Sequence, residues 1–244
     1  MLTLNQTDKI NEEALFSALM STKNTAARFR LDYTLEQALA MLRTACRVEV
    51  QSRCRTYNET PQFLKHISDV ARWITATDNS SFGLFLCGGA GNGKTTILRA
   101  LHNVVNFVRR DERFSSRDDC FPVKGFSFVP AKNLVQLAKA YANPTRENEA
   151  DAALFKHLRN IEILAIDDLG QEPKECIHYG DFLTPAIDII SSRYDNQLCT
   201  LISSNLTPPE IASYYDERIA DRFREMMTIV NFGNEVSFRK SNNA

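Results

Sequence analysis

A glycine-rich run in the first half of the chain has the spacing of a phosphate-binding loop. It reads Gly88-Gly89-Ala90-Gly91-Asn92-Gly93-Lys94-Thr95-Thr96 and satisfies G-x-x-x-x-G-K-[ST] at every fixed position. Glycines let successive backbone N–H groups point into one concavity, and the start of a following helix adds positive partial charge. Lys94 can then reach the β- and γ-phosphates of a nucleotide, and the Thr95 hydroxyl can bind Mg²⁺. The run predicts a nucleoside triphosphate site, against the alternative of a glycine-rich turn before an ordinary helix.

An acidic pair at the end of an apolar run is the second candidate site. Residues 161–166 are Ile-Glu-Ile-Leu-Ala-Ile, and Asp167 and Asp168 follow them. A buried strand that ends in carboxylates is what a magnesium nucleotide site needs, so we expect Asp167 to share a Mg²⁺ with Thr95. Asp168, on the opposite side of the pleat, could polarise an attacking water. The alternative is a solvated acidic turn, which the preceding phosphate loop disfavours.

Polar groups near the end of the chain form two weaker candidates. Asn205 follows another apolar run and could orient a water against the γ-phosphate, although Ser-Ser-Asn is also ordinary turn chemistry. Arg218 and Arg222 are four residues apart and share one face of a helix. Such an arginine can stabilise transition-state charge at a neighbouring subunit's γ-phosphate. An ion-pair ladder with Glu217 and Asp221 is the alternative explanation, and spacing alone favours the ladder.

The elements that would position these groups alternate between strands and helices. We expect strands at 83–87, 126–129, 161–166, 198–203 and 228–232 (the last continued by 236–238), with helices at 94–108, 134–141, 148–158 and 185–194. This alternation predicts an α/β fold with a parallel sheet covered on both faces, and ligands at the carboxyl ends of its strands. We therefore expect a small helical N-terminal region over 1–59 and a nucleotide-binding domain over 60–244.

Composition excludes several other classes of protein. The 244 residues are 43% hydrophobic and carry a net charge of -1, so nothing attracts the whole chain to nucleic acid. There is no basic, apolar leader and no apolar run of membrane-spanning length, so we expect neither secretion nor a membrane partner. The six scattered cysteines form no C-x-x-C pair, which favours reduced thiols in a cytoplasmic protein.

The order of these motifs resembles that of the AAA+ ATPases, and among them the DnaC-type helicase loaders and the IstB-type transposition helpers. The resemblance covers roughly residues 61–238 and rests on the runs at 88–95, 166–170, 202–205 and 217–222. It implies a P-loop NTPase of the AAA+ core type, with a parallel five-stranded sheet flanked by helices and no C-terminal lid domain. It also implies an ATPase that uses ATP and Mg²⁺.

Roles for single residues follow from the same resemblance. The loop from Gly88 to Thr96 would bind the nucleotide, and Thr95 and Asp167 would coordinate Mg²⁺. Asp168 would occupy the catalytic acidic position. Many AAA+ proteins carry Glu there, so the shorter side chain of Asp168 would affect the rate of ATP hydrolysis. Asn205 would be sensor 1.

Partners are implied as well. Arg222 would be the first choice for an arginine finger, and Arg218 the second. Because a lid domain is not expected, closure of the site around the nucleotide would depend on a neighbouring subunit in a homo-oligomer. In this clade a helix after the second strand lines a channel for single-stranded DNA. The cations at that place here are Lys132, Lys139, Arg146, Lys156 and Arg159.

Several functions are compatible with this set of residues. The first is an ATP-dependent replication accessory protein that assembles on single-stranded DNA and delivers a replicative helicase, with residues 1–59 binding the partner. The second is an IstB-like regulator that binds duplex DNA and a transposase. A nucleotide-gated switch with negligible hydrolysis and a P-loop kinase of a small metabolite are the remaining alternatives.

Overall fold

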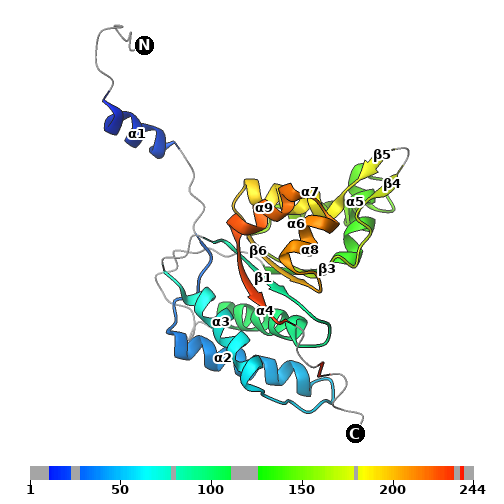
Figure 1. The fold of residues 1–244 in the computed structure, drawn as a ribbon. Coiled ribbons are helices and arrows are strands. Elements are labelled where there is room, and N and C mark those ends of the chain that lie inside the picture. Colours follow the sequence, from blue (N-terminus) through cyan, green and yellow to red (C-terminus); the bar gives the residue numbers. More distant parts are fainter. Residues whose placement is uncertain are drawn as a thin grey trace.

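A five-stranded parallel sheet forms the centre of the molecule, as the sequence predicts (Figure 1). The computed structural model describes residues 11–22, 28–77, 81–110, 126–178, 181–233 and 237–238. The strands lie in the order β2-β3-β6-β1-β7. Their bounds are β1 Gly83–Cys87, β2 Phe126–Pro130, β3 Ile163–Leu169, β6 Cys199–Ser204 and β7 Met227–Asn231. The strand that precedes the phosphate loop, β1, therefore lies between β6 and β7, and β3 lies next to β6.

Helices cover both faces of the sheet because its strands are apolar on both sides. Leu84 and Leu86 of β1 belong to one buried cluster, and the alternating Phe85 and Cys87 belong to the other. The first cluster lies under α2 (Leu35–Gln51), α3 (Pro61–Thr75) and α4 (Lys94–Arg110). The elements of the second face are the short 3-10 helix η1 (Ala131–Asn133), α5 (Leu134–Ala142), α6 (Glu149–Asn160), α7 (Pro185–Asp195), α8 (Pro208–Tyr214) and α9 (Glu217–Met226).

The N-terminal helices differ in how they pack. A capping box starts α2: Gln37 N–H donates to the Thr34 hydroxyl, and Thr34 N–H donates to the Gln37 side chain. Leu42 and Cys46 of α2 are then buried in the same cluster as the helix of the phosphate loop. In contrast, α1 (Glu12–Ser21) buries none of its residues (Figure 1). The domain boundary that we expect at residue 60 stays a prediction.

Two differences from the expected elements concern the site. The segment between β3 and α7, where we expected neither a strand nor a helix, forms a short antiparallel hairpin of β4 (Cys176–His178) with β5 (Asp181–Leu183). Ser237 and Phe238 do not continue the edge strand, and Val236 lies outside the described residues. Within the described part of the chain, no helix follows β7, and none is long and apolar enough to cross a membrane.

Candidate functional site

The glycines of the phosphate loop occupy positions that other residues would strain. Gly88, Gly91 and Gly93 have φ values of +117°, +82° and +100°. A Cβ at Gly88 would lie 2.8 Å from the backbone nitrogen of Gly233, and one at Gly93 would lie 2.5 Å from Cε2 of Phe63. The loop therefore fits between β7's end and α3 only with glycine at these two positions.

A buried ammonium group fills the concavity of the loop. Lys94 is 4% exposed, and its Nζ donates to the carbonyl oxygens of Gly88 at 2.7 Å and Gly89 at 2.6 Å. It also donates to Oδ1 of Asn92 at 3.2 Å and of Asn205 at 3.1 Å. The structure thus brings Asn205, at the end of β6, to the predicted phosphate-binding lysine.

A buried hydrogen-bond donor at the loop without a partner among the described residues suits an anionic ligand. The side chain of Asn92 is 1% exposed, and its Nδ2 has no hydrogen-bond partner among the described residues. Buried donors of this kind are rare in folded proteins and call for an acceptor. Together with the Lys94 ammonium and the start of α4, this donor fits the phosphates of a nucleotide. The Cys87 thiol beside the loop stays neutral, because burial raises its pKa to about 11.

The proposed metal ligands lie in contact with each other. Thr95 Oγ1 donates to Asp167 Oδ1 at 2.9 Å, and Ser203 Oγ donates to the same oxygen at 2.5 Å. Asp167 is 5% exposed. No cluster of three or more metal-binding side chains occurs in the described residues. The pair instead offers one carboxylate and one hydroxyl, which fits Mg²⁺ because this ion takes few protein ligands and completes its shell with phosphate oxygens and water.

The second carboxylate sits on an irregular piece of backbone. Asp168 has φ +58°, and the pairing of β3 with β6 shifts register between Ile166 and Leu169. Its N–H donates to Ser203 Oγ at 2.9 Å, so one hydroxyl bonds both members of the acidic pair. A bulge with a left-handed residue re-aims a side chain at a cost of about 1–3 kcal/mol. The side chain of Asp168 is exposed while Asp167 is buried, as the pleat predicts.

The two candidate arginines of α9 have different surroundings. Arg222 lies against α7: its guanidinium donates to the Ser191 hydroxyl, pairs with Asp195 at 3.7 Å and lies 5.1 Å from the centroid of the Tyr194 ring. Arg218 is exposed and makes no hydrogen bond or ion pair with the described residues. Of the two, Arg218 is the one that its own chain leaves accessible.

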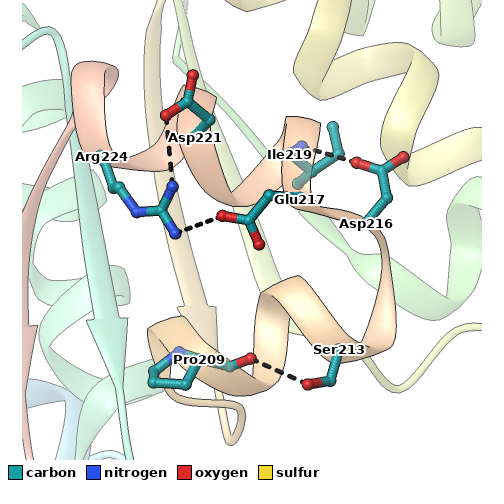
Figure 2. A network of polar contacts seen from close by, with 7 residues as sticks. All are labelled: Pro209, Ser213, Asp216, Glu217, Ile219, Asp221 and Arg224. Carbon is teal, nitrogen blue, oxygen red and sulfur yellow. Dashed lines mark hydrogen bonds and ion pairs between the residues drawn. The ribbon is translucent and has the colours of Figure 1, made fainter.

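The carboxylates of α9 bind a third arginine. Arg224 pairs with Glu217 at 2.7 Å and with Asp221 at 3.3 Å (Figure 2). Asp216 caps the helix by accepting the Ile219 N–H at 2.8 Å, which fixes where α9 begins (Figure 2). The ion-pair ladder expected for Arg218 and Arg222 is therefore wrong, since its acids are taken by Arg224.

The cations after β2 lie in η1, α5, α6 and the loop that joins α5 to α6. Lys132, Arg146 and Lys156 are exposed, and Lys139 is half-buried. None of these four forms an ion pair with the described residues. The guanidinium of Arg159 lies 5.7 Å from the ring centroid of Tyr141, whose side chain is 41% exposed. The segment joins unpaired charges to an aromatic surface, although Glu147 and Glu149 are exposed beside them.

Contacts with the C-terminal segment were not expected from the sequence. Gly89 N–H donates to the Gly233 carbonyl at 2.8 Å, and Phe238 N–H donates to the Gly91 carbonyl at 3.0 Å. The Phe238 ring also packs edge-on against Phe63, which lies against Gly93. No local sequence pattern predicts these contacts, because about 145 residues separate the partners in the chain. Ser203 could have been found, since a hydroxyl two residues before Asn205 faces the strand of the acidic pair.

The fold has relatives among solved structures. No protein-family model and no curated protein sequence matches the chain. The crystal structure of DnaI aligns with 78% of this chain and 93% of its own, at 19% identity and a TM-score of 0.50. The crystal structure of the DnaC helicase loader aligns with 72% of this chain and 93% of its own, at 18% identity and a TM-score of 0.50. The chain therefore shares its α/β fold with DnaI and with the DnaC helicase loader.

Proposed function

We propose that the chain is an AAA+ ATPase that assembles on single-stranded DNA and delivers a replicative helicase. The observation that carries the proposal is the meeting of Lys94, Thr95, Asp167 and Asn205 at the carboxyl ends of β1, β3 and β6. Lys94 would bind the β- and γ-phosphates, and Thr95 with Asp167 would hold Mg²⁺. The ion, when bound, neutralises charge on the phosphates and helps to orient them.

The chain's own residues divide the remaining work. Asp168 would accept a proton from the attacking water, and Asn205 would orient that water. The rest of the site would come from the next subunit, which offers an arginine from α9. We assign this role to Arg218, because Arg222 is already bound to α7. The site is thus half of a shared one, and the nucleotide joins two copies of the chain in a homo-oligomer.

The DNA and helicase partners are proposed from the surface of the chain and from its fold. The unpaired cations of η1, α5 and α6 suit a phosphate backbone, and Tyr141 offers a surface on which a base can stack. The fold shared with the DnaC helicase loader supports the loader role. We assign helicase binding to the helical region 1–59, whose helix α1 leaves Leu15, Phe16 and Leu19 exposed.

A steady-state ATPase assay with and without single-stranded DNA tests the proposal. We expect DNA to stimulate turnover in the wild type and not in Lys132→Ala/Lys156→Ala, whose nucleotide affinity should be unchanged. Turnover that ignores single-stranded DNA but responds to duplex DNA would favour the transposition regulator. A helicase-loading assay on single-stranded circles then separates a loader from an ATPase with another client.

A nucleotide-gated switch remains the second candidate because of Asp168. The side chain of Asp168 is one methylene shorter than that of Glu, and its backbone is left-handed. Both features affect how closely the carboxylate can approach an attacking water. A switch predicts that ATP binding drives assembly and that Asp168→Asn changes neither assembly nor turnover. An ATPase predicts that Asp168→Asn still assembles with ATP but loses at least about tenfold in turnover.

A further inference from the structure

A buried carboxylate lies just beyond the acidic pair and is not used by the proposed chemistry. Glu172 is 1% exposed, which is unusual for a glutamate. One carboxylate oxygen accepts the Gly170 N–H at 2.9 Å, and the other accepts the Tyr215 hydroxyl. The Tyr214 hydroxyl donates to the Glu172 backbone carbonyl at 2.8 Å. Three donors from two separate segments therefore converge on this one residue.

Those segments belong to the two halves of the shared site. On one side, Gly170 has φ +92° and ends the turn that begins at Asp168. On the other side, Tyr215 closes α8 and is followed directly by Asp216, the cap of α9. The first turn of α9 carries Arg218. Glu172 thus connects the loop of the catalytic carboxylates to the start of the helix that presents the arginine.

Packing and hydrogen bonds hold both ends of this connection. The Tyr215 side chain is 2% exposed and packs edge-on against Tyr214, so the hydroxyl that reaches Glu172 has a fixed position. The turn from Asp168 to Gly170 is equally constrained, because the Gln171 N–H closes it onto the Asp168 carbonyl at 3.1 Å and Ser203 holds its start. Burial raises the pKa of Glu172, although the Tyr215 hydrogen bond opposes the shift. Keeping such a group in the core costs stability unless its hydrogen bonds are made.

We propose that Glu172 and Tyr215 form a positioning latch that fixes Arg218 of one subunit relative to that subunit's own nucleotide site. The latch rests on the proposed function, since it requires Arg218 to act on the neighbouring site. Through the latch, binding of Mg²⁺ and nucleotide at Asp167 and Asp168 sets the position of Arg218 in the same subunit. That position decides how well Arg218 completes the nucleotide site of the next subunit. Glu172 and Tyr215 are positioning residues and touch neither nucleotide nor water.

A subunit-doping experiment isolates this effect. Every dopant carries Asp168→Asn, so that it binds nucleotide with strongly reduced turnover, and the residual turnover of dopant alone is subtracted. Wild-type protein is mixed with an about ninefold excess of dopant on single-stranded DNA, and turnover per wild-type subunit is measured. A dopant that also carries Arg218→Ala should lower this turnover about tenfold, because nine-tenths of the wild-type sites lose their arginine. A dopant with Tyr215→Phe should lower it at least about threefold.

Two further dopants provide the controls. Tyr57→Phe removes a similar bond, from a tyrosine hydroxyl to Glu59 at 3.0 Å, on the opposite face of the sheet, and should have no effect. Glu172→Gln can still accept from Gly170 and can donate to the Tyr215 oxygen, so it should retain most of the wild-type turnover, whereas Glu172→Ala should behave like Tyr215→Phe. Thermal unfolding of each dopant confirms that it is folded.

The outcomes separate the latch from the function on which it rests. If Arg218→Ala dopants inhibit and folded Tyr215→Phe and Glu172→Ala dopants do not, the latch is overturned and the shared site stands. If Arg218→Ala dopants do not inhibit either, Arg218 does not act on the neighbour, and both the assignment of Arg218 to the shared site and the latch are refuted. Equal inhibition by Tyr57→Phe would likewise overturn the latch, because any lost tyrosine hydroxyl would then suffice.

Discussion

Replacing Arg222 with alanine should destabilise the free subunit, whereas replacing Arg218 should not. The reason is that Arg222 is bound by α7 through Ser191, Asp195 and the ring of Tyr194, while Arg218 contacts no polar partner in the described structure. In contrast, Arg218→Ala should abolish most of the turnover of the assembled protein. The two substitutions therefore separate folding from catalysis on one helix.

The size of the stability effect follows from the contacts. The hydrogen bond from Arg222 to Ser191 contributes about 1 kcal/mol. The ion pair with Asp195 contributes roughly 0.5 kcal/mol, since the aspartate is 63% exposed and screened by solvent. The total of about 1–2 kcal/mol corresponds to a fall of roughly 3–6 °C in the unfolding midpoint of a chain of this length. A surface change such as Arg218→Ala should move the midpoint by less than about 2 °C.

Thermal unfolding without nucleotide and ATPase turnover with single-stranded DNA are the two measurements. Arg218→Ala should keep the midpoint and lower turnover at least about a hundredfold. Arg224→Ala, on the same helix but paired only with Glu217 and Asp221, is the matched control and should change neither strongly. The reasoning is refuted if Arg222→Ala leaves the midpoint unchanged and abolishes turnover, because Arg222 would then be the shared arginine.

Four other substitutions test the site. Lys94→Ala should abolish binding of a fluorescent ATP analogue, since it removes the cation that faces the phosphates, and retained affinity would refute its role. Gly93→Ala should cost about 2–5 kcal/mol in thermal or denaturant unfolding, from its positive φ and the contact with Phe63, and a second change of Phe63→Leu should recover only the steric part. Ser203→Ala should lower turnover more than nucleotide affinity, because the acidic pair loses the hydroxyl that orients it. Glu172 has a raised pKa, so its contribution to stability is present near pH 4.5 and is lost as the pH rises through the folded-state value. As the pH rises through this interval, the unfolding midpoint of Glu172→Gln should therefore increase relative to that of the wild type. A difference between the two midpoints that does not change with pH would contradict the raised pKa of Glu172.

The parts of the molecule that the sequence predicts are those with local signals. The phosphate loop has fixed spacing and lies between a strand and a helix, and the alternation of apolar runs yields the parallel sheet. The ends of the strands then follow, which is why Asn205 and Asp167 could be expected beside Lys94 and Thr95. Their assigned roles stay predictions.

The parts that the sequence does not predict depend on contacts between distant residues. Helical spacing placed Arg218 and Arg222 on one face but could not show that α7 binds one of them and leaves the other exposed. A glutamate after Gly170 looks like a solvated loop residue, and its burial against Tyr214 and Tyr215 involves residues more than 40 positions away. The β4–β5 hairpin was missed because three-residue strands beside a proline carry little pattern.

The position of β1 within the sheet has a consequence for synthesis of the protein. Both strands that pair with β1 come later in the chain, and β7 starts 140 residues after β1 ends. The phosphate loop also needs Gly233 and Phe238 for its hydrogen bonds. A ribosome adding about 5–20 residues per second would take roughly 7–30 s to complete these partners. The nascent chain therefore carries the loop's sequence long before Phe238, the last of these partners, has been synthesised.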